Sequence, residues 1–507
     1  MLAHRGVRPG HAFFFFCALL AACEGGGDLR QQSLINDANA RTSALSCLYS
    51  AANGSAWNYS QGWMVGDPCT NSWYGISCKT DKFGATLLRE VDLRLNKLEG
   101  SLPSELSALS FVSELLLSDW RERQADLRGS IPTEVGRMTA LSVLKISGQR
   151  LDSSLPTEVG LLTALTVVAL QSNSLESMLP TELGRLSIVS EFLRLDRNHF
   201  NGPIPTELGS ALTSITSTFS IAENSLASML PTQLGHMIHL KDNFLFASNL
   251  LTGSIPTEFG HIVEISSELD MRNNSFSGNL PTQLGQATLM STGFRFETNS
   301  FNGPIPTQFG KWTLLSDTFR SQGQSLSGRL PSELGKWTAM TGDLLVNAQK
   351  IEGSIPTEIG LMTELSGEVA LGNNKFTGPV PTEIGLLAKL KSGIVFKSNR
   401  LSNTLPTQLG LLSSIETSFQ ASSNAFIGNI PSELGALIKV TDSFNIQDVS
   451  VSGTLPTELG RLSNLEAGFS VSSNRLSKSL PTQVIECVVF LLIGNESLNT
   501  LMLVRYQ

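Results

Sequence analysis

The sequence predicts an α/β solenoid, in which stacked repeats place a parallel β-sheet on the concave face and short helical or 3-10 turns on the convex side. Three observations predict it. The phrase G-x-[IL]-P-T-[EQ]-[LF]-G occurs sixteen times, with variations, among the 507 residues. Its prolines, from Pro103 to Pro481, are 24 to 29 residues apart up to Pro231 and 25 residues apart after it. Short alternations of apolar and polar residues precede most of the phrases, as expected for half-buried strands.

Each position of the repeat has a structural reason, which the segment FSIAENSLASMLPTQLG illustrates. Phe219 and Ile221 alternate with small residues and predict a strand with one buried side. Asn224 follows, where its side chain can hydrogen-bond backbone groups as the chain leaves the strand. Pro231 suits the first position of a helical turn, and the Gln two residues later lies near the positive end of that turn. Gly235 closes the turn where a side chain would clash.

The asparagines recur at one position of the repeat, so stacking predicts a ladder of amide side chains along the core. Leu and Asn at fixed offsets, with a period of 20 to 29 residues, are typical of a leucine-rich repeat. Because no unit could bury its apolar edge alone, the array shares one continuous core. Gln takes the ladder position at residues 149, 324 and 349, and Val449 interrupts it. The asparagines of the ladder are Asn173, Asn198, Asn224, Asn249, Asn274, Asn299, Asn374, Asn399, Asn424 and Asn474.

Composition fits a long shared core and excludes some classes of function. Hydrophobic residues make up 41 % of the chain and charged residues 16 %. The net charge of −8, the isoelectric point near 5.4 and the lack of any Lys/Arg run argue against nucleic acid as the main partner. The sequence has no nucleophile elbow, P-loop, dinucleotide fingerprint or H-E-x-x-H motif, so we expect no enzyme activity and no cofactor.

The first residues indicate an exported protein. Residues 1–23 carry two arginines, an apolar stretch from Ala12 to Ala22 and small residues. We interpret them as a signal peptide, because the apolar stretch is too short to span a bilayer. LAAC at Leu20–Cys23 also resembles a bacterial lipobox, which would make Cys23 a lipid-bearing N-terminus; the eukaryotic character of the repeats favours an ordinary cleaved signal. No other segment is long and apolar enough to be a transmembrane helix.

Cysteines and glycosylation acceptors fit the secretory pathway. Cys69 and Cys78, in DPCTNSWYGISC, are near enough in sequence for a local disulfide in an oxidising compartment. Cys47 and Cys487 have no evident partner, and no C-x-x-C motif occurs. Four sequons would be usable for N-glycosylation, at Asn53, Asn58, Asn273 and Asn495.

The phrase N-x-L-x-G-x-I-P-x-x-L-G resembles the plant-type leucine-rich repeat of receptor kinases, receptor-like proteins and polygalacturonase-inhibiting proteins. The resemblance covers roughly residues 46–484. The segment ALSCLYSAANGSAWNYSQGWMVGDPCTNSWYGISC is similar to the N-terminal cap of that family, with Trp57, Trp63 and Trp73 at its aromatic positions. It implies a solenoid that perceives a ligand, as receptor ectodomains do, or that inhibits a foreign hydrolase.

We therefore divide the chain into a signal peptide (1–23), a linker with the start of the cap helix (24–45), an N-terminal cap (46–86), about sixteen repeats (87–484) and an irregular tail (485–507). Most units carry 25 residues where the family has 24, with the extra residue just before the strand, so binding geometry cannot be copied from the family. The tail loses the repeat pattern. We interpret it as an improvised cap on the last repeat, with a membrane anchor or an unreliable chain end as alternatives.

The variable residues of each strand face the concave surface, and one window of them is charged. Adjacent strands would place Arg295 beside Asp270 and Arg320, and Glu297 beside Arg272. Arginine and carboxylates on an otherwise neutral face form a candidate binding patch for a peptide or glycan. The alternative is a lattice of solvated ion pairs that are worth little each. We define the concave patch as Glu268, Asp270, Arg272, Arg295, Glu297, Arg320 and Gln322.

Histidines offer one further hypothesis, a zinc site on the lateral face. His236 and His261 share one position of the repeat, and His239 and Glu264 share another, so the four side chains could gather around a metal ion. Surface histidines in tolerant loops are far commoner, and we expect no metal.

Two other repeated features have structural explanations. Trp312 and Trp337 replace leucine in successive turns, and we expect them to pack in the core. The glutamates of the P-T-E phrases could suggest calcium, yet each favours its own helical turn. Gln interrupts that row at residues 233, 283, 308, 408 and 483, which a row of metal ligands would not tolerate.

The sequence as a whole predicts a secreted, non-enzymatic protein that recognises a protein or peptide, with a glycan as a further ligand class, on its concave face. Signalling would then need a partner such as a membrane co-receptor. The alternative function is a structural or adhesive scaffold of the cell surface or wall, in which the array serves as a spacer.

Overall fold

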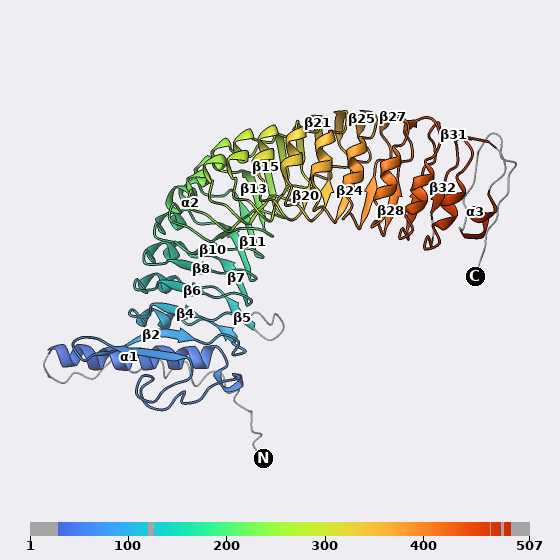
Figure 1. The fold of residues 1–507 in the computed structure, drawn as a ribbon. Coiled ribbons are helices and arrows are strands. Elements are labelled where there is room, and N and C mark those ends of the chain that lie inside the picture. Colours follow the sequence, from blue (N-terminus) through green and yellow to red (C-terminus); the bar gives the residue numbers. More distant parts are fainter. Residues whose placement is uncertain (1–28, 120–125, 467, 478–480, 488–507) are drawn as a thin grey trace, which may run out of the picture. The chain divides into compact units, whose positions relative to one another are not determined.

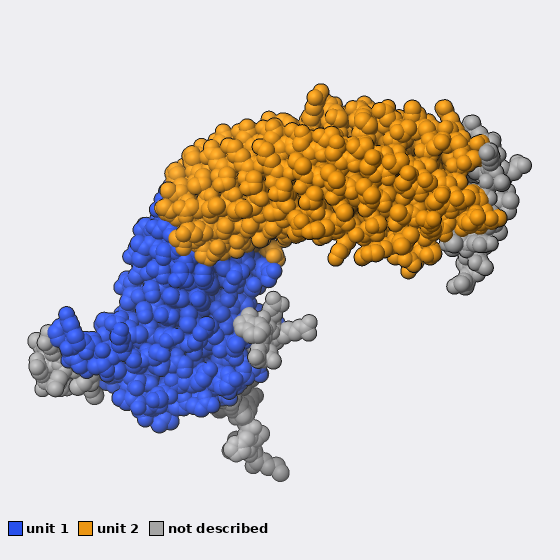
Figure 2. Space-filling model, in the orientation of Figure 1, with its two compact units in different colours: residues 1–214 blue, residues 215–507 orange. Residues whose placement is uncertain are grey.

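The computed structural model describes residues 29–119, 126–466, 468–477 and 481–487, which belong to two compact units, residues 1–214 and 215–507 (Figure 2). The predicted signal peptide (1–23), the sequon at Asn495 and most of the predicted tail lie outside the described residues.

The first unit begins with a helix and a hairpin at one end of its repeats (Figure 1). Helix α1 (Leu29–Ala51) is followed by a 3-10 turn (Gly54–Ala56) and by strands β1 (Ile76–Thr80) and β2 (Thr86–Asp92), which pair antiparallel. The ring of Trp63 lies 4.8 Å from that of Trp57 and 4.9 Å from that of Trp73, centroid to centroid, and all three are buried. Buried Asn96 joins this segment to the next strands, because its side chain exchanges hydrogen bonds of 2.7 and 2.8 Å with the backbone of Tyr59.

The rest of the first unit repeats a strand, a second strand and a short turn (Figure 1). The first sheet continues in parallel from β2 through β4 (Glu114–Leu116), β6 (Val143–Lys145), β8 (Val167–Ala169) and β10 (Phe192–Arg194). A second parallel sheet contains β3 (Glu99–Ser101), β5 (Asp126–Gly129), β7 (Arg150–Ser154), β9 (Ser174–Met178) and β11 (His199–Gly202). The 3-10 turns span Ser104–Ala108, Thr133–Arg137, Thr157–Leu161 and Thr181–Arg185, and helix α2 (Thr206–Ala211) takes the place of the next turn.

The second unit has the same organisation over a longer array. Its first sheet contains β12 (Thr218–Ser220), β14 (Asn243–Leu245), β16 (Glu268–Asp270), β18 (Gly293–Arg295), β20 (Phe319–Arg320), β22 (Leu344–Leu345), β24 (Glu368–Ala370), β26 (Gly393–Val395), β28 (Ser418–Gln420), β30 (Ser443–Asn445) and β32 (Phe469–Ser470). Its second sheet contains β13 (Ser225–Met229), β15 (Leu250–Gly253), β17 (Ser275–Asn279), β19 (Ser300–Gly303), β21 (Ser325–Arg329), β23 (Lys350–Gly353), β25 (Lys375–Gly378), β27 (Arg400–Asn403) and β29 (Ala425–Phe426), and β31 (Ser452–Gly453) pairs separately with β33 (Arg475–Leu476). The 3-10 turns span Thr232–His236, Thr257–His261, Thr282–Gln286, Thr307–Lys311, Ser332–Lys336, Thr357–Leu361, Thr382–Leu386, Thr407–Leu411, Ser432–Ala436 and Thr457–Arg461, before helix α3 (Thr482–Cys487).

Residues one period apart are neighbours in the first sheet, as the sequence predicts. In the second unit Phe219 pairs with Phe244, and Leu269 with Phe294, in parallel register. These side chains are buried, and the rings of Phe219 and Phe244 lie 5.6 Å apart. The predicted α/β solenoid and its shared core are therefore confirmed.

The predicted ladder links each repeat to the one before it. Asn249 is buried, and its Oδ1 accepts a 3.0 Å hydrogen bond from the backbone N–H of Leu226 while its Nδ2 donates a 3.0 Å bond to the carbonyl of Ile221. Gln324 makes the same connections, since its Oε1 accepts from Phe301 N–H at 3.0 Å and its Nε2 donates to the carbonyl 28 residues earlier at 2.6 Å. The ladder thus supplies partners to buried backbone groups that the strands leave unpaired.

The turns depart from the prediction by one residue. Pro231, with φ −62° and ψ 134°, is extended and precedes the turn Thr232–His236, so the expectation that proline takes the first helical position was wrong. Its carbonyl accepts the hydrogen bond from Leu234 N–H that closes the turn (3.2 Å), a role that needs no N–H of its own. Gly235 is required for packing, because a Cβ there would lie 2.5 Å from the carbonyl oxygen of Glu258 in the next turn.

The second sheet was not predicted from the sequence. Its strands follow the ladder position and pair in parallel, as Ala227 does with Leu250. Each is short, and several contain a glycine with positive φ, such as Gly253 (φ 76°). In a sequence, glycine within a short polar segment normally indicates a turn. The strands of the second sheet were overlooked for this reason.

The two tryptophans of the turns belong to the core, as predicted. Trp312 and Trp337 are fully buried. Each indole Nε1 donates a hydrogen bond to a backbone carbonyl of the preceding repeat, Trp312 to Leu284 (3.2 Å) and Trp337 to Phe309 (2.9 Å).

The ladder predicts a large cost for removing one amide. Asn249→Ala would leave a buried N–H and a buried carbonyl without partners, each costing roughly 1–3 kcal/mol. We therefore expect the free energy of unfolding to fall by about 2–4 kcal/mol. Chemical denaturation followed by circular dichroism measures it. Asn249→Gln is the matched control, because Gln serves the ladder at residues 149, 324 and 349. Equal stability of the Ala and Gln variants would contradict the role of the amide.

Candidate ligand-binding site

The concave patch lies on strands β16, β18 and β20 of the second unit, where alternate side chains point away from the core. Leu269 and Phe294 are buried on the core side, so the residues beside them in each strand face outward. Parallel pairing places Asp270 opposite Arg295, and Arg295 opposite Arg320. The predicted neighbours of Arg295 are therefore its neighbours in the structure.

Ion pairs organise the first half of the patch. Arg272 Nε, two residues further along the chain, lies 3.1 Å from Asp270 Oδ2. Arg295 reaches back to the preceding strand, with its Nε 3.0 Å from Glu268 Oε1. This second contact is close enough for an ion pair but is not aligned as a hydrogen bond. Each guanidinium is thus held in place without all its hydrogen-bonding capacity being used.

Three buried polar atoms of the patch have no hydrogen-bond partner within the described part of the chain. They are Glu268 Oε1, Glu297 Oε2 and Arg320 Nε, one on each of three successive strand segments. A buried polar atom without a partner costs on the order of 1–3 kcal/mol, and most such atoms in folded proteins find partners. Both signs of charge are represented in the patch, so it can attract ligand groups of either charge.

Burial changes the acid–base behaviour of Asp270, whose side chain is only 6 % exposed. Loss of solvation disfavours its charged form and raises the pKa of the carboxyl to about 6. The backbone N–H of Arg272, which donates a 3.1 Å hydrogen bond, and the Arg272 charge oppose this rise, while Glu268 and Glu297 add to it. The net charge of the patch therefore changes near pH 6.

The structure adds acidic residues that were not predicted as part of the site. Arg320 Nη2 lies 3.1 Å from Oδ2 of Asp343, which directly precedes β22, and Arg295 Nη2 lies 3.8 Å from Asp317 Oδ2. Burial, followed by the charge of Asp343, raises the pKa of the Glu368 carboxyl. One edge of the face is consequently acidic beyond the predicted window.

An apolar row continues the patch along the same strand position, and it was also missed. Leu345, Ala370 and Val395 form a buried cluster on β22, β24 and β26. Pairing places Leu345 opposite Arg320, and Ala370 follows Leu345 as Val395 follows Ala370. Three charged positions (Asp270, Arg295 and Arg320) are thus followed by three apolar ones. Comparing the residues at intervals of 25 beyond residue 320 in the sequence would have found this row.

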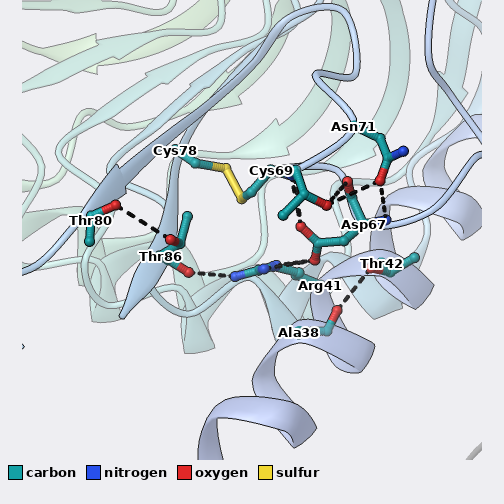
Figure 3. The surroundings of a disulfide bond; sticks show 10 residues. Ala38, Arg41, Thr42, Asp67, Cys69, Asn71, Cys78, Thr80 and Thr86 are labelled. Carbon is teal, nitrogen blue, oxygen red and sulfur yellow. Dashed lines mark hydrogen bonds and ion pairs between the residues drawn. A yellow bond between two sulfur atoms is a disulfide. The ribbon is translucent and has the colours of Figure 1, made fainter. Parts of the chain in front are cut away.

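The predicted disulfide is present. Cys69 and Cys78 are bonded, with their Cα atoms 5.6 Å apart (Figure 3). Beside them Arg41 of helix α1 forms a 2.7 Å ion pair with Asp67 and donates a 2.6 Å hydrogen bond to the carbonyl of Thr86 (Figure 3). Cys47, for which the sequence offered no evident partner, also takes part in a disulfide; sequence spacing alone gave no means of pairing it.

The three described sequons lie where their side chains reach the surface in part or in full. Asn58 and Asn273 are exposed and Asn53 is intermediate. Asn53 Nδ2 donates to Glu99 (3.0 Å), and Asn58 Nδ2 donates to the carbonyl of Leu95 (2.9 Å). Asn273 directly follows Arg272, so a glycan there would border the concave patch. Their glycosylation stays a prediction.

The proposed zinc ligands do not gather. His239 Nδ1 lies 3.5 Å from Glu264 Oε1, and Lys241 Nζ lies 3.8 Å from the other oxygen. Among the described residues no group of three or more His, Cys, Asp or Glu side chains is placed to hold a metal ion. The same part of the chain contains no helix with the length and apolar character needed to cross a membrane.

Comparison with known proteins identifies the repeat type. No protein-family model matches the chain. The structure is similar to the ectodomain of the Arabidopsis thaliana receptor kinase GASSHO1/SCHENGEN3, solved with CASPARIAN STRIP INTEGRITY FACTOR 2, at 27 % identity and a TM-score of 0.62, over 77 % of this chain and 48 % of that one. It is similar to the TDR receptor at 29 % identity and a TM-score of 0.66, over 80 % and 67 % of the two chains.

A third neighbour is the plant peptide hormone receptor RGFR1 in complex with RGF2, at 25 % identity and a TM-score of 0.63, over 78 % of this chain and 69 % of that one. The chain spans about half the length of the first of these ectodomains. The parallel solenoid and its amide ladder are those of a leucine-rich repeat protein, and these neighbours support the plant type.

Proposed function

We propose that this protein is an extracellular, non-enzymatic recognition protein, and that the concave face of its second unit binds an extended peptide or protein segment, with a glycan as a further ligand class. The binding surface comprises the concave patch and the apolar row. The single observation that carries the proposal is the strand register, which places Asp270, Arg295 and Arg320 on adjacent strands and continues them with three apolar residues at the same strand position.

The order of charged and then apolar residues along the face favours a peptide over a small molecule as the ligand. Asp270, Arg295 and Arg320 offer charge across three strands, and the apolar row continues for three more. Successive parallel strands lie about 4.8 Å apart, so the combined surface is tens of ångströms long. An extended chain can place a polar segment over the first part and an apolar side chain over the second.

Two further observations support the proposal. Two of the similar ectodomains were solved as complexes, one with CASPARIAN STRIP INTEGRITY FACTOR 2 and one, a peptide hormone receptor, with RGF2. The disulfides at Cys69–Cys78 and at Cys47 favour an oxidising compartment such as the cell exterior.

Peptide selection tests whether the concave patch binds a ligand. Random 12-residue peptides displayed on phage are selected on the wild-type protein, and the enriched peptides are synthesised. Arg295→Gln/Arg320→Gln should weaken their binding about tenfold or more, on the order of 1.4 kcal/mol, because two charged donors leave the centre of the site. Isothermal titration calorimetry measures the affinity. Gln occupies the same strand position at Gln420, so the fold should persist.

The matched control for this experiment is Arg400→Gln/Arg475→Gln, which removes the same charge from exposed positions off the patch. The control should bind like the wild type, and both variants should melt near the wild-type temperature. If no peptide is enriched, or if the patch variant binds as well as the control, the scaffold function is favoured instead.

A further prediction follows from the raised pKa of Asp270. Its folded pKa of about 6 exceeds the ordinary value of 3.8, so its contribution to stability is fully present below about pH 4 and is lost as the pH rises through 6. Asp270→Asn removes this titration, and the wild type should therefore lose roughly 2–3 kcal/mol relative to the variant between pH 4 and 7.5.

Chemical denaturation of both proteins across this pH range measures the difference. Asp317→Asn is the control, because it makes the same substitution in a side chain that is 47 % exposed. Parallel stability curves for wild type and Asp270→Asn would contradict the assignment.

A further inference from the structure

A groove of about 1040 Å³ crosses the repeats of the first unit, away from the strands of its first sheet. It is lined by the Pro-Thr-Glu phrases of three successive repeats, Pro132–Glu134, Pro156–Glu158 and Pro180–Glu182, together with Met178 at the end of β9. Equivalent side chains from successive repeats therefore line one continuous surface, and a ligand that fits one repeat can continue across the next.

Part of the wall of the groove is apolar, and serine and threonine side chains line the rest beside the glutamates. Proline rings from each phrase contribute to the apolar part, and Met178 is 62 % exposed. The Met178 side chain lies over Gly202 of the next repeat, where an added Cβ would come within 2.8 Å of Met178 Cγ. Gly202 thus leaves the space that the methionine occupies. Such a surface suits aliphatic side-chain stems.

The charged residues that line the groove are all acidic: Glu134, Glu158 and Glu182. In each phrase the threonine hydroxyl donates a hydrogen bond to Oε2 of its glutamate, at 3.2, 3.2 and 3.3 Å. This bond orients the carboxylate and uses one of its oxygens. Carboxylates held at a repeating interval beside an apolar wall match side chains with an aliphatic stem and a cationic end, which are Lys and Arg.

The acidic row is continuous in this unit and broken in the other. Glu occupies the position at residues 105, 134, 158, 182 and 207, whereas Gln interrupts the row at residues 233, 283, 308, 408 and 483. The carboxylates do not converge on a shared ion, because no group of three or more potential ligands gathers anywhere in the described chain. One cationic group for each repeat fits this spacing better than one metal ion does.

We propose that this groove binds an extended, basic segment of a partner protein, with Lys or Arg stems against the prolines and Met178 and their charged ends at Glu134, Glu158 and Glu182. Charge complementarity selects the occupant, since an acidic or neutral segment would place no counter-charge beside the three carboxylates. This surface is separate from the concave patch, and the proposal does not depend on the function assigned to that patch.

The test uses the full chain and a fluorescein-labelled (Lys-Ala)₆ peptide, with (Glu-Ala)₆ as the probe of opposite charge. The groove variant is Glu134→Gln/Glu158→Gln/Glu182→Gln; Gln is the natural residue at the same repeat position in five other units, so the fold should persist. Its matched control is Glu333→Gln/Glu358→Gln/Glu383→Gln, which neutralises three consecutive glutamates at the same position in the second unit. Both variants change the net charge equally.

Fluorescence anisotropy should detect binding of the basic peptide to the wild type and none of the acidic one. We expect the groove variant to lose at least tenfold in affinity and the control to stay within about twofold. Equal losses in both variants would mean that net charge alone attracts the peptide, and would overturn the proposal, as would unchanged binding to the groove variant. Arg295→Gln/Arg320→Gln should leave this binding unchanged, which separates its outcome from that of the concave patch.

Discussion

The structure depends on one interaction, the buried side-chain amide that joins most repeats to their predecessors. At Asn249 a single side chain satisfies an N–H 23 residues earlier and a carbonyl 28 residues earlier. Those hydrogen bonds are buried and have a fixed geometry. They therefore set the register of the strands as well as stabilising them. Glycine imposes a second constraint at the opposite side of the repeat, since Gly235 allows successive turns to approach. Between these two points the apolar side chains have little freedom in where they stack.

Register converts a linear sequence into surfaces, and this is where function can reside in an array of nearly identical units. Along one strand position the first sheet of the second unit presents Asp270, Arg295 and Arg320, and then the apolar row. Along a turn position the first unit presents an unbroken row of glutamates beside proline rings. Neither surface exists within any single repeat. Each arises because the residue at one variable position of the repeat differs between units, while the residues at the structural positions stay the same.

Most of the fold and part of the site could be predicted from the sequence. The period, the ladder and the buried Phe219 and Phe244 follow from patterns that repeat many times, so errors in any one unit average out. The one-residue error at Pro231 and the overlooked second sheet arose where a short segment is governed by backbone conformation and not by burial. Ion-pair choice could not be predicted either: register placed Arg295 beside Asp270, yet its closest carboxylate is Glu268, because long side chains reach diagonally across strands. The depth of Asp270, and hence its pKa, depends on the packing of all its neighbours at once.

The most direct test of the account is cysteine cross-linking between adjacent strands. Gln420 and Asn445 are partners one period apart, and Ser470 is the partner of Asn445 one period further on. Cα atoms on adjacent strands are about 4.8 Å apart, within disulfide range, whereas two periods exceed it. Gln420→Cys/Asn445→Cys should therefore oxidise to an intramolecular disulfide detectable by peptide mapping, and Gln420→Cys/Ser470→Cys should not. Cross-linking of the second pair in place of the first would contradict the stacking register on which both proposed surfaces depend.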